Sequence, residues 1–143
     1  MGTGPHVAIL MAVYQGRDYL PAQLESLSGQ SHRGWSLIAG DDGSTDGSAA
    51  LLADFAAGLD PGQVRAVPGP RQGAAANFRA LLGHVPAHAT HVAFCDQDDV
   101  WEAGKLADGL AALPADRPAI WCSRVVNCDA DLRQLSLSPV PRH

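Results

Sequence analysis

Three carboxylates, Asp96, Asp98 and Asp99, crowd the stretch FCDQDDVW (residues 94–101) at the end of an apolar run. In a strand that leaves a sheet, side chains two residues apart share a face, so Asp96 and Asp98 would point the same way. A hard divalent cation would offset their repulsion, and Mg²⁺ or Mn²⁺ usually takes one or two protein carboxylates together with water and phosphate oxygens. The stretch therefore predicts a metal–diphosphate site on Asp96 and Asp98. The alternative is a solvated turn whose aspartates cap the next helix.

A second acidic cluster, GDDGSTDGS (residues 40–48), also follows an apolar run. Ser44, Thr45 and Asp46 are typical of a well-capped turn from a strand into a helix. Capping does not explain two consecutive aspartates at the end of a buried strand. A carboxylate at that place could accept a hydrogen bond from the imide N–H of a uracil or thymine ring.

The elements that must position these clusters alternate between apolar strands and amphipathic helices. We expect strands at 7–14, 35–40, 64–67, 91–96 and 119–128, and helices at 18–28, 44–59, 74–85 and 101–113. This alternation predicts an α/β fold with a largely parallel sheet flanked by helices. Ligands of such sheets bind at the carboxyl ends of the strands, where both acidic clusters fall. We expect residues 1–143 to form a single domain, with a core at about 7–131 and an unsupported tail at 132–143.

Composition excludes several classes of function. The chain has 143 residues, 46% of them hydrophobic, and a net charge of −5 without a basic stripe, which argues against nucleic-acid binding. The three cysteines, Cys95, Cys122 and Cys128, form no CxxC pair, so we expect free, buried thiols in a reducing cytoplasm. The longest apolar run, at 7–14, is too short to span a bilayer. Any membrane association would therefore be peripheral.

Taken together, the motifs resemble a known family. The segment DDGSTDGS after a strand, then a DxD followed by Asp-Val-Trp and a helix with Lys105-Leu106, resembles the family 2 glycosyltransferases of GT-A (Rossmann-like) fold. The opening LMAVYQG is similar to the first strand and loop of that family. The resemblance runs in order from about Val7 to about Asp131. The stretch FCDQDDVW resembles the branch that includes bacterial rhamnosyltransferases of surface-polysaccharide biosynthesis.

The resemblance implies a role for each matching residue. Tyr14 would lie against the nucleobase, and Asp42 would accept the N–H of the base. Asp98 would coordinate the metal bound to the diphosphate, and Asp96 would face the ribose or the water shell of the metal. Asn77 matches a frequent asparagine of the family and would also bind substrate.

Two departures from the family pattern bear on activity. The arginine that often precedes the asparagine is Ala76 here, which leaves Arg71 or Arg79 as candidates for a phosphate contact. The family's catalytic base is a carboxylate well downstream of the DxD, whereas Asp129 and Asp131 come too early after it. We therefore expect the nucleotide-binding half of the enzyme, C-terminally truncated, with no catalytic base in this chain.

The function that the resemblance implies is an inverting, metal-dependent transfer of a sugar from a UDP- or dTDP-sugar, held with Mg²⁺ or Mn²⁺, to a glycan or lipid-linked acceptor. The expected location is cytoplasmic, at the inner face of the plasma membrane. One alternative is a non-catalytic module that binds nucleotide-sugar without transfer. The other is a phosphatase of the haloacid dehalogenase type, in which the first aspartate of the DxD is the nucleophile. Sugar transfer, donor binding alone and phosphate-ester hydrolysis distinguish the three.

Overall fold

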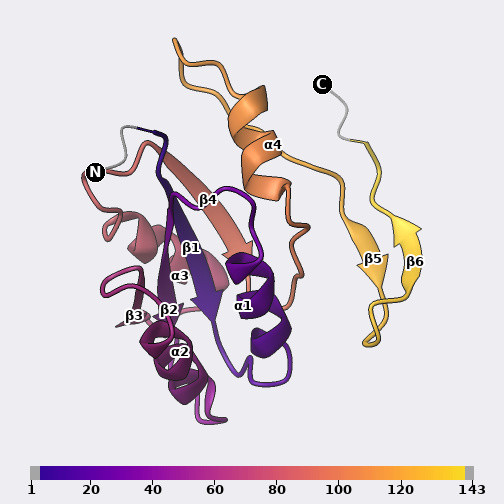
Figure 1. The fold of residues 1–143 in the computed structure, drawn as a ribbon. Helices are drawn as coiled ribbons and strands as arrows, with labels where there is room; N and C mark the ends of the chain where they lie inside the picture. Colours follow the sequence, from indigo (N-terminus) through magenta and orange to yellow (C-terminus); the bar gives the residue numbers. More distant parts are fainter. Residues whose placement is uncertain (1–3, 141–143) are drawn as a thin grey trace. The chain divides into compact units, whose positions relative to one another are not determined.

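The computed structural model describes residues 4–140 and contains a four-stranded parallel sheet in the order β3-β2-β1-β4 (Figure 1). Its strands are Val7–Val13 (β1), Trp35–Asp41 (β2), Val64–Pro68 (β3) and His91–Asp96 (β4). The helices are Leu20–Ser28 (α1), Ser48–Ala57 (α2), Ala74–Leu82 (α3) and Lys105–Ala112 (α4). Helices α1, α2 and α3 connect the successive strands of this sheet. The predicted α/β fold with a largely parallel sheet is thus confirmed.

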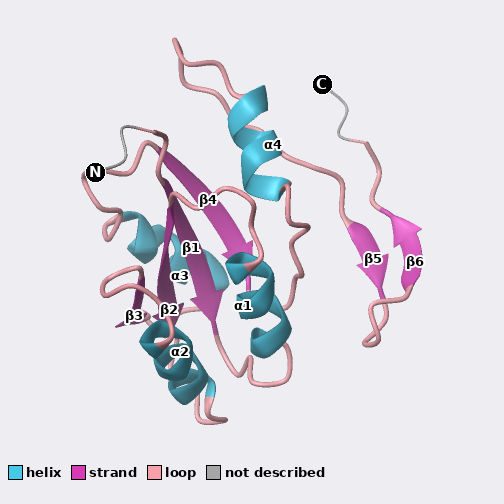
Figure 2. Ribbon diagram, viewed as in Figure 1, coloured by secondary structure: helices cyan, strands magenta, loops and turns pink. Residues whose placement is uncertain are grey.

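Strand β1 lies inside the sheet and provides its most buried residues. Each residue from Val7 to Met11 is at most 3% exposed. A continuous apolar run suits such a strand, because helices cover both faces of a parallel sheet. Helix α3 lies on one face, and α1 and α2 lie on the other (Figure 2). On the α3 face, Leu81 packs in one buried cluster with Ala8 and Leu10.

Three helices begin later than the sequence predicts, α1 by two residues and α2 and α4 by four residues each. Helix α2 begins at Ser48 rather than at Ser44, after Gly47 with a φ of 97°. The predicted N-cap, Ser44 or Thr45, is wrong, because those hydroxyl groups hydrogen-bond to another loop. Helix α4 begins at Lys105 rather than at Trp101.

Within residues 4–140, no helix is both long enough and apolar enough to cross a membrane.

The last part of the chain differs most from the prediction. The chain divides into two compact units, residues 1–108 and 109–143. The fifth strand predicted at 119–128 is wrong in its length and its place: only Val126–Cys128 is a strand (β5), and it pairs antiparallel with Gln134–Leu137 (β6) in a separate sheet. Residues 129–133 join β5 directly to β6, so the two strands pair with each other. A parallel pairing of β5 with the main sheet would instead need a longer crossover connection. Strand β6 lies within the expected tail, whose residues 141–143 are outside the described part of the chain.

The cysteines divide between the two units. Cys95 in β4 is buried, and burial raises the pKa of its thiol, so the expectation of a free, buried thiol is confirmed there. Cys122 and Cys128 are free but exposed, which corrects the prediction for both. Cys128 lies in β5, which belongs to a small two-stranded sheet whose residues are exposed, and Cys122 lies in the irregular segment before β5.

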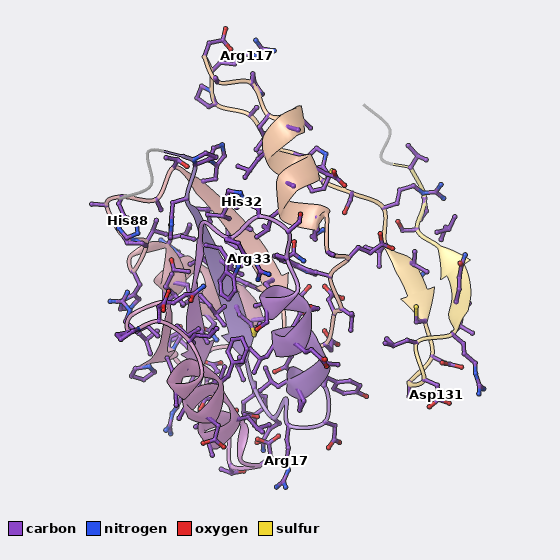
Figure 3. All side chains as sticks on the ribbon, in the orientation of Figure 1. Arg17, His32, Arg33, His88, Arg117 and Asp131 are labelled. Atoms are coloured by element: carbon purple, nitrogen blue, oxygen red, sulfur yellow. The ribbon has the colours of Figure 1, made fainter. Side chains whose placement is uncertain are left out.

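Three histidines gather near the amino ends of the strands. The rings of His6 and His88 meet edge to face at 4.5 Å, and His6 Nε2 lies 3.0 Å from Ser36 Oγ. Figure 3 labels His32 and His88 at this end of the molecule. Burial lowers the pKa of His6, and the nearby charges of His88 and His32 lower it further. His6 is therefore neutral in the folded protein at a pH where the unfolded chain begins to bind a proton.

We expect the stability of the protein to fall as the pH is lowered below about 6.5, the ordinary pKa of histidine. The unfolded chain binds more protons there than the folded one, so the contribution of His6 is fully present above that pH and decreases toward its folded pKa. Urea denaturation at pH 7.5 and pH 5.5 measures the loss. His6→Gln should reduce it, with His84→Gln as the control for removing one imidazole. An equal loss in His6→Gln would show that other groups cause the pH dependence.

Candidate functional site

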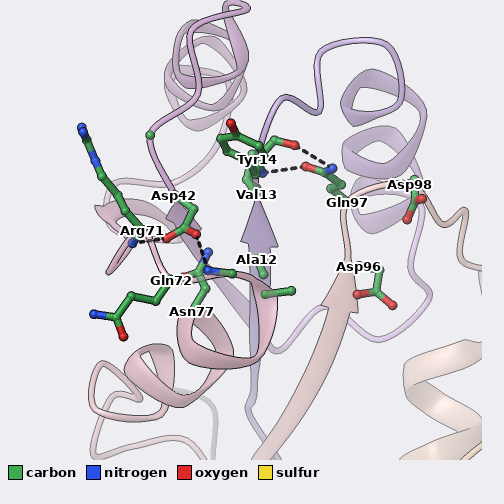
Figure 4. A pocket seen from close by; sticks show the side chains of 13 residues that line it. Ala12, Val13, Tyr14, Asp42, Arg71, Gln72, Asn77, Asp96, Gln97 and Asp98 are labelled. Carbon is green, nitrogen blue, oxygen red and sulfur yellow. Dashed lines mark hydrogen bonds between the residues drawn. The ribbon is translucent and has the colours of Figure 1, made fainter.

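A pocket of about 640 Å³ opens at the carboxyl ends of β1, β2 and β4 (Figure 4). Both acidic clusters contribute to it, because parallel strands bring their carboxyl ends to one edge of the sheet. All five predicted substrate-binding residues line the pocket: Tyr14, Asp42, Asn77, Asp96 and Asp98. The structure therefore brings the five together, from segments far apart in the sequence.

Asp42 is the buried carboxylate of the pocket, at 9% exposure. It accepts a hydrogen bond from the backbone N–H of Arg71 at 2.6 Å and one from that of Gly73 at 3.1 Å. A Cβ on Gly69 would lie only 2.5 Å from Asp42 Oδ1, so the β3–α3 loop needs a glycine to approach this closely. Asp42 thus holds the β3–α3 loop. An ionised carboxylate has about four acceptor sites, which leaves capacity for a ligand N–H.

The rest of the GDDGSTDGS segment holds the loop between β1 and α1. Ser44 Oγ accepts a hydrogen bond from Gln15 N–H at 2.9 Å, and Ser48 Oγ accepts one from Gly16 N–H at 3.0 Å. Asp46 accepts hydrogen bonds from the Ser48 hydroxyl and from Arg17 N–H. The Ser48 hydroxyl is the main reason why the pKa of Asp46 lies below its usual value, with the Arg17 N–H second. The polar residues expected to cap a helix therefore fix a loop beside the pocket.

Asn77 lies in the wall of the pocket and is 1% exposed. Its Nδ2 donates to the carbonyl of Gly40 at 2.7 Å, which anchors α3 to β2. Its Oδ1 is buried without a hydrogen-bond partner among residues 4–140. A Cβ on Gly40 would overlap Asn77 Oδ1, so the two positions depend on each other. This geometry gives Asn77 a packing role, and its contact with substrate stays a prediction.

Of the two candidate phosphate contacts, Arg71 lines the pocket and Arg79 does not. The guanidinium of Arg71 extends away from the pocket in Figure 4 and packs beside Gly43. Arg79 lines a separate shallow hollow on α3. Only the backbone N–H of Arg71 contributes to the arrangement around Asp42. Figure 4 shows the Arg71 side chain extending away from Asp96 and Asp98.

Asp96 and Asp98 are exposed, and within residues 4–140 neither side chain has a hydrogen-bond or ion-pair partner. Their charges reach Asp99, whose pKa is raised first by burial and then by Asp96 and Asp98, while Lys105 offsets part of the effect. No three His, Cys, Asp or Glu side chains in the described part of the chain could together hold a metal ion. An ion that takes one or two protein carboxylates, and its other ligands from water and phosphate, fits these residues.

The sequence analysis did not identify the residues that hold the loop between β4 and α4 (residues 97–104), called the carboxylate loop below because it follows Asp96 and contains Asp98 and Asp99. Gln23 Nε2 donates to the carbonyl of Asp96 at 3.2 Å, and Ser26 Oγ accepts from Trp101 N–H at 3.1 Å. Gln30 Nε2 donates to the carbonyl of Glu102 at 2.8 Å. Positions 23, 26 and 30 share one face of the helical repeat with the buried leucines. The recurrence of Gln23, Ser26 and Gln30 beside the leucines could have indicated that these polar side chains hydrogen-bond to another segment of the chain.

Comparison with known proteins identifies relatives for most of the chain. Residues 8–140 match the family described as "Glycosyl transferase family 2". The chain is 31% identical over 119 residues to EpsE of Bacillus subtilis strain 168, assigned as a glycosyltransferase, with 82% of this chain and 41% of EpsE covered. It is 28% identical over 119 residues to the dTDP-rhamnosyl transferase RfbG of Shigella flexneri, with 81% of this chain and 41% of RfbG covered. The chain thus spans about two fifths of these relatives.

Solved structures share the fold. Staphylococcus aureus TarS 1–349 in complex with UDP-GlcNAc superposes with a TM-score of 0.63 at 20% identity, covering 74% of this chain and 30% of TarS. The mannosyltransferase PcManGT of Pyrobaculum calidifontis, in complex with GDP-Man and Mn²⁺, superposes with a TM-score of 0.67 at 21% identity, covering 77% of this chain and 33% of that one. Both are glycosyltransferases of GT-A fold, which is also the fold of this chain.

Proposed function

The chain belongs to glycosyl transferase family 2, and we propose that its pocket binds the nucleoside diphosphate part of a sugar donor together with a divalent metal. The observation that carries the proposal is that two acidic clusters line one pocket at the carboxyl ends of the sheet. One carboxylate, Asp42, is buried and hydrogen-bonded to backbone, while Asp96 and Asp98 are exposed and unpaired within residues 4–140. The two ends of the pocket thus offer different chemistry to one ligand.

At the first end, we assign the nucleobase to Tyr14 and Asp42. The ring of Tyr14 is 57% exposed beside the pocket and offers a flat surface for stacking. Asp42, fixed by two backbone N–H groups, can use its remaining acceptor capacity for the imide N–H of uracil or thymine. A uridine or deoxythymidine diphosphate sugar is therefore the proposed donor. The names of RfbG and of the TarS complex support these two nucleotides, and GDP-Man in PcManGT makes GDP the necessary comparison.

At the second end, Asp98 would hold Mg²⁺ or Mn²⁺, with Asp96 facing the ribose or the ion's water shell. When bound, such an ion neutralises the charge that develops on the diphosphate leaving group. Asp98 and Asp96 bring the negative charge that attracts the ion, and Gln23 fixes the backbone of Asp96 through its carbonyl. The Mn²⁺ in the PcManGT structure supports the choice of metal.

Transfer with inversion requires a base that deprotonates the acceptor hydroxyl. We assign that role to no residue of 4–140. The proposed acceptor is a glycan or lipid-linked glycan, and the proposed location is cytoplasmic, peripheral at the inner face of the membrane. Donor binding without transfer is the second candidate, because a missing base would affect transfer and leave donor binding unchanged. Family membership removes the reason for considering a phosphatase.

Calorimetric titration with UDP, dTDP and GDP, each with and without Mn²⁺, tests the proposal. We expect UDP or dTDP to bind more tightly than GDP, because the larger purine ring places its N–H groups farther from the ribose than a pyrimidine does, which does not match an acceptor positioned for uracil or thymine. We also expect binding to strengthen with Mn²⁺ for the diphosphates and little for UMP or dTMP, which lack the second phosphate. A folded protein that binds no diphosphate under either condition would contradict the donor site. Incubation with labelled UDP- or dTDP-sugars and an isolated lipid-linked glycan then separates transfer from binding alone.

A further inference from the structure

The middle residue of the DxD, Gln97, makes two hydrogen bonds across the pocket to a single residue. Its Oε1 accepts from the backbone N–H of Tyr14 at 2.9 Å, and its Nε2 donates to the backbone carbonyl of Tyr14 at 2.9 Å (Figure 4). We propose that Gln97 is a positioning residue that couples the nucleoside end of the pocket to the metal-binding carboxylates. This inference rests on the proposed function, since it assigns the residue through which binding at one end of that site affects binding at the other.

The pairing continues the sheet beyond the point where its strands separate. Strands β1 and β4 are parallel neighbours, and their last paired residues are Ala12 and Asp96. Beyond them, the amide of Gln97 takes the place of a backbone peptide group, because a primary amide carries a donor and an acceptor side by side. The carboxylate of a glutamate could accept from Tyr14 N–H but could not donate to the carbonyl. The residue between the two aspartates is thus specified by its amide.

Gly16 leaves the space that the amide fills. A Cβ on residue 16 would overlap Gln97 Oε1 and lie 2.8 Å from Gln97 Cδ. The obstacle is the end of a side chain, so an alanine at 16 would displace the amide while the backbone stays in place. Gly16 N–H is held separately by Ser48 Oγ at 3.0 Å. Gly16→Ala therefore offers a second way to break the Gln97–Tyr14 pair without touching the carboxylate loop.

Other contacts fix the carboxylate loop on its far side, so we expect the chain to fold without the Gln97 amide. The carbonyl of Asp96 accepts from Gln23, and Trp101 N–H donates to Ser26. Gln97 adds a direct link between Tyr14 and the residue that stands between Asp96 and Asp98. The link can increase the affinity only of a ligand that contacts both ends of the pocket at once. A nucleoside diphosphate does so when the metal binds its diphosphate at Asp96 and Asp98. Loss of the amide should therefore reduce the gain in nucleotide affinity that the metal provides.

The test is the dissociation constant of the diphosphate that binds the wild type, measured with and without Mn²⁺. Couplings between sites typically change affinity by about 5- to 150-fold. In Gln97→Met, which keeps the side-chain length and loses the amide, we expect the Mn²⁺-induced gain to fall by about 5-fold or more while affinity without metal changes little. The part of the gain that Asp98 provides directly should remain. Gly16→Ala should reduce the gain as well, and the double variant should add little to either single one. Gln134→Met, the same substitution in β6, should keep the wild-type gain.

Backbone hydrogen exchange of the ligand-free protein supplies a second readout. Exchange at Tyr14 N–H should accelerate in Gln97→Met and Gly16→Ala, because this N–H then loses its acceptor. A wild-type gain with Mn²⁺ that persists unchanged in both variants would overturn the inference and leave the proposed function standing. If the wild type binds diphosphate with no gain from Mn²⁺, the metal part of the proposed function fails, and the coupling role fails with it.

Discussion

Asp98→Asn is expected to abolish the stabilisation that Mn²⁺ with UDP or dTDP gives the wild-type protein. A ligand at 100 times its dissociation constant stabilises the folded state by about 2.7 kcal/mol if it binds only that state. For a chain of this size, that energy corresponds to a rise in Tm on the order of 10 °C. Asparagine keeps the shape of the side chain and loses the charge that holds the metal. Thermal unfolding with and without ligand measures the difference.

The same substitution should act in the opposite direction on the ligand-free protein. Burial and then the charges of Asp96 and Asp98 raise the pKa of Asp99, which indicates that Asp96 and Asp98 repel the Asp99 carboxylate. Removing one charge relieves that repulsion, so ligand-free Asp98→Asn should unfold at the same temperature as the wild type or slightly above it. Asp54→Asn, an exposed position on α2, is the matched control and should keep the full ligand response. A full ligand response in Asp98→Asn would show that this carboxylate does not hold the metal.

Asp42→Ala is expected to destabilise the protein itself. The substitution removes the acceptor from the N–H groups of Arg71 and Gly73 at a position that is 9% exposed. Hydrogen bonds to charged groups contribute about 1.5–3 kcal/mol each, so we expect a loss of about 3–5 kcal/mol. That is a large part of the roughly 5–15 kcal/mol that stabilises a typical domain. Urea denaturation measures the loss.

Asp42→Asn refines the prediction, because its one oxygen can still accept from one of the two N–H groups. We expect an intermediate loss of stability and a weaker preference for uracil or thymine over guanine nucleotides. Asp18→Ala removes an exposed carboxylate and should leave stability unchanged. If Asp42→Ala is as stable as the wild type and fails only to bind nucleotide, Asp42 serves the ligand alone. Its bonds to the β3–α3 loop would then contribute little to folding.

Local pattern was enough to predict the four parallel strands and the edge of the sheet where the site lies. The run VAILMAVY has no polar alternation, which a strand covered on both faces requires, and β1 is indeed buried from Val7 to Met11. The motif resemblance predicted the family and five of the residues that line the pocket. Their individual roles stay predictions. The fifth strand failed because an apolar run does not specify its partner, and β5 pairs with nearby β6.

The sequence by itself determined which residue types stand at the ends of the strands, and so the chemistry available to the pocket. Only the tertiary structure decided which of these polar groups remain free for a ligand. Asp42 and Asp98 are both aspartates that follow strands, yet Asp42 is hydrogen-bonded to the β3–α3 loop while Asp98 is exposed. Gln97 likewise acquires its partner from a residue 83 positions away. Hydrogen-bond partners depend on the approach of distant segments, which spacing along the chain does not encode.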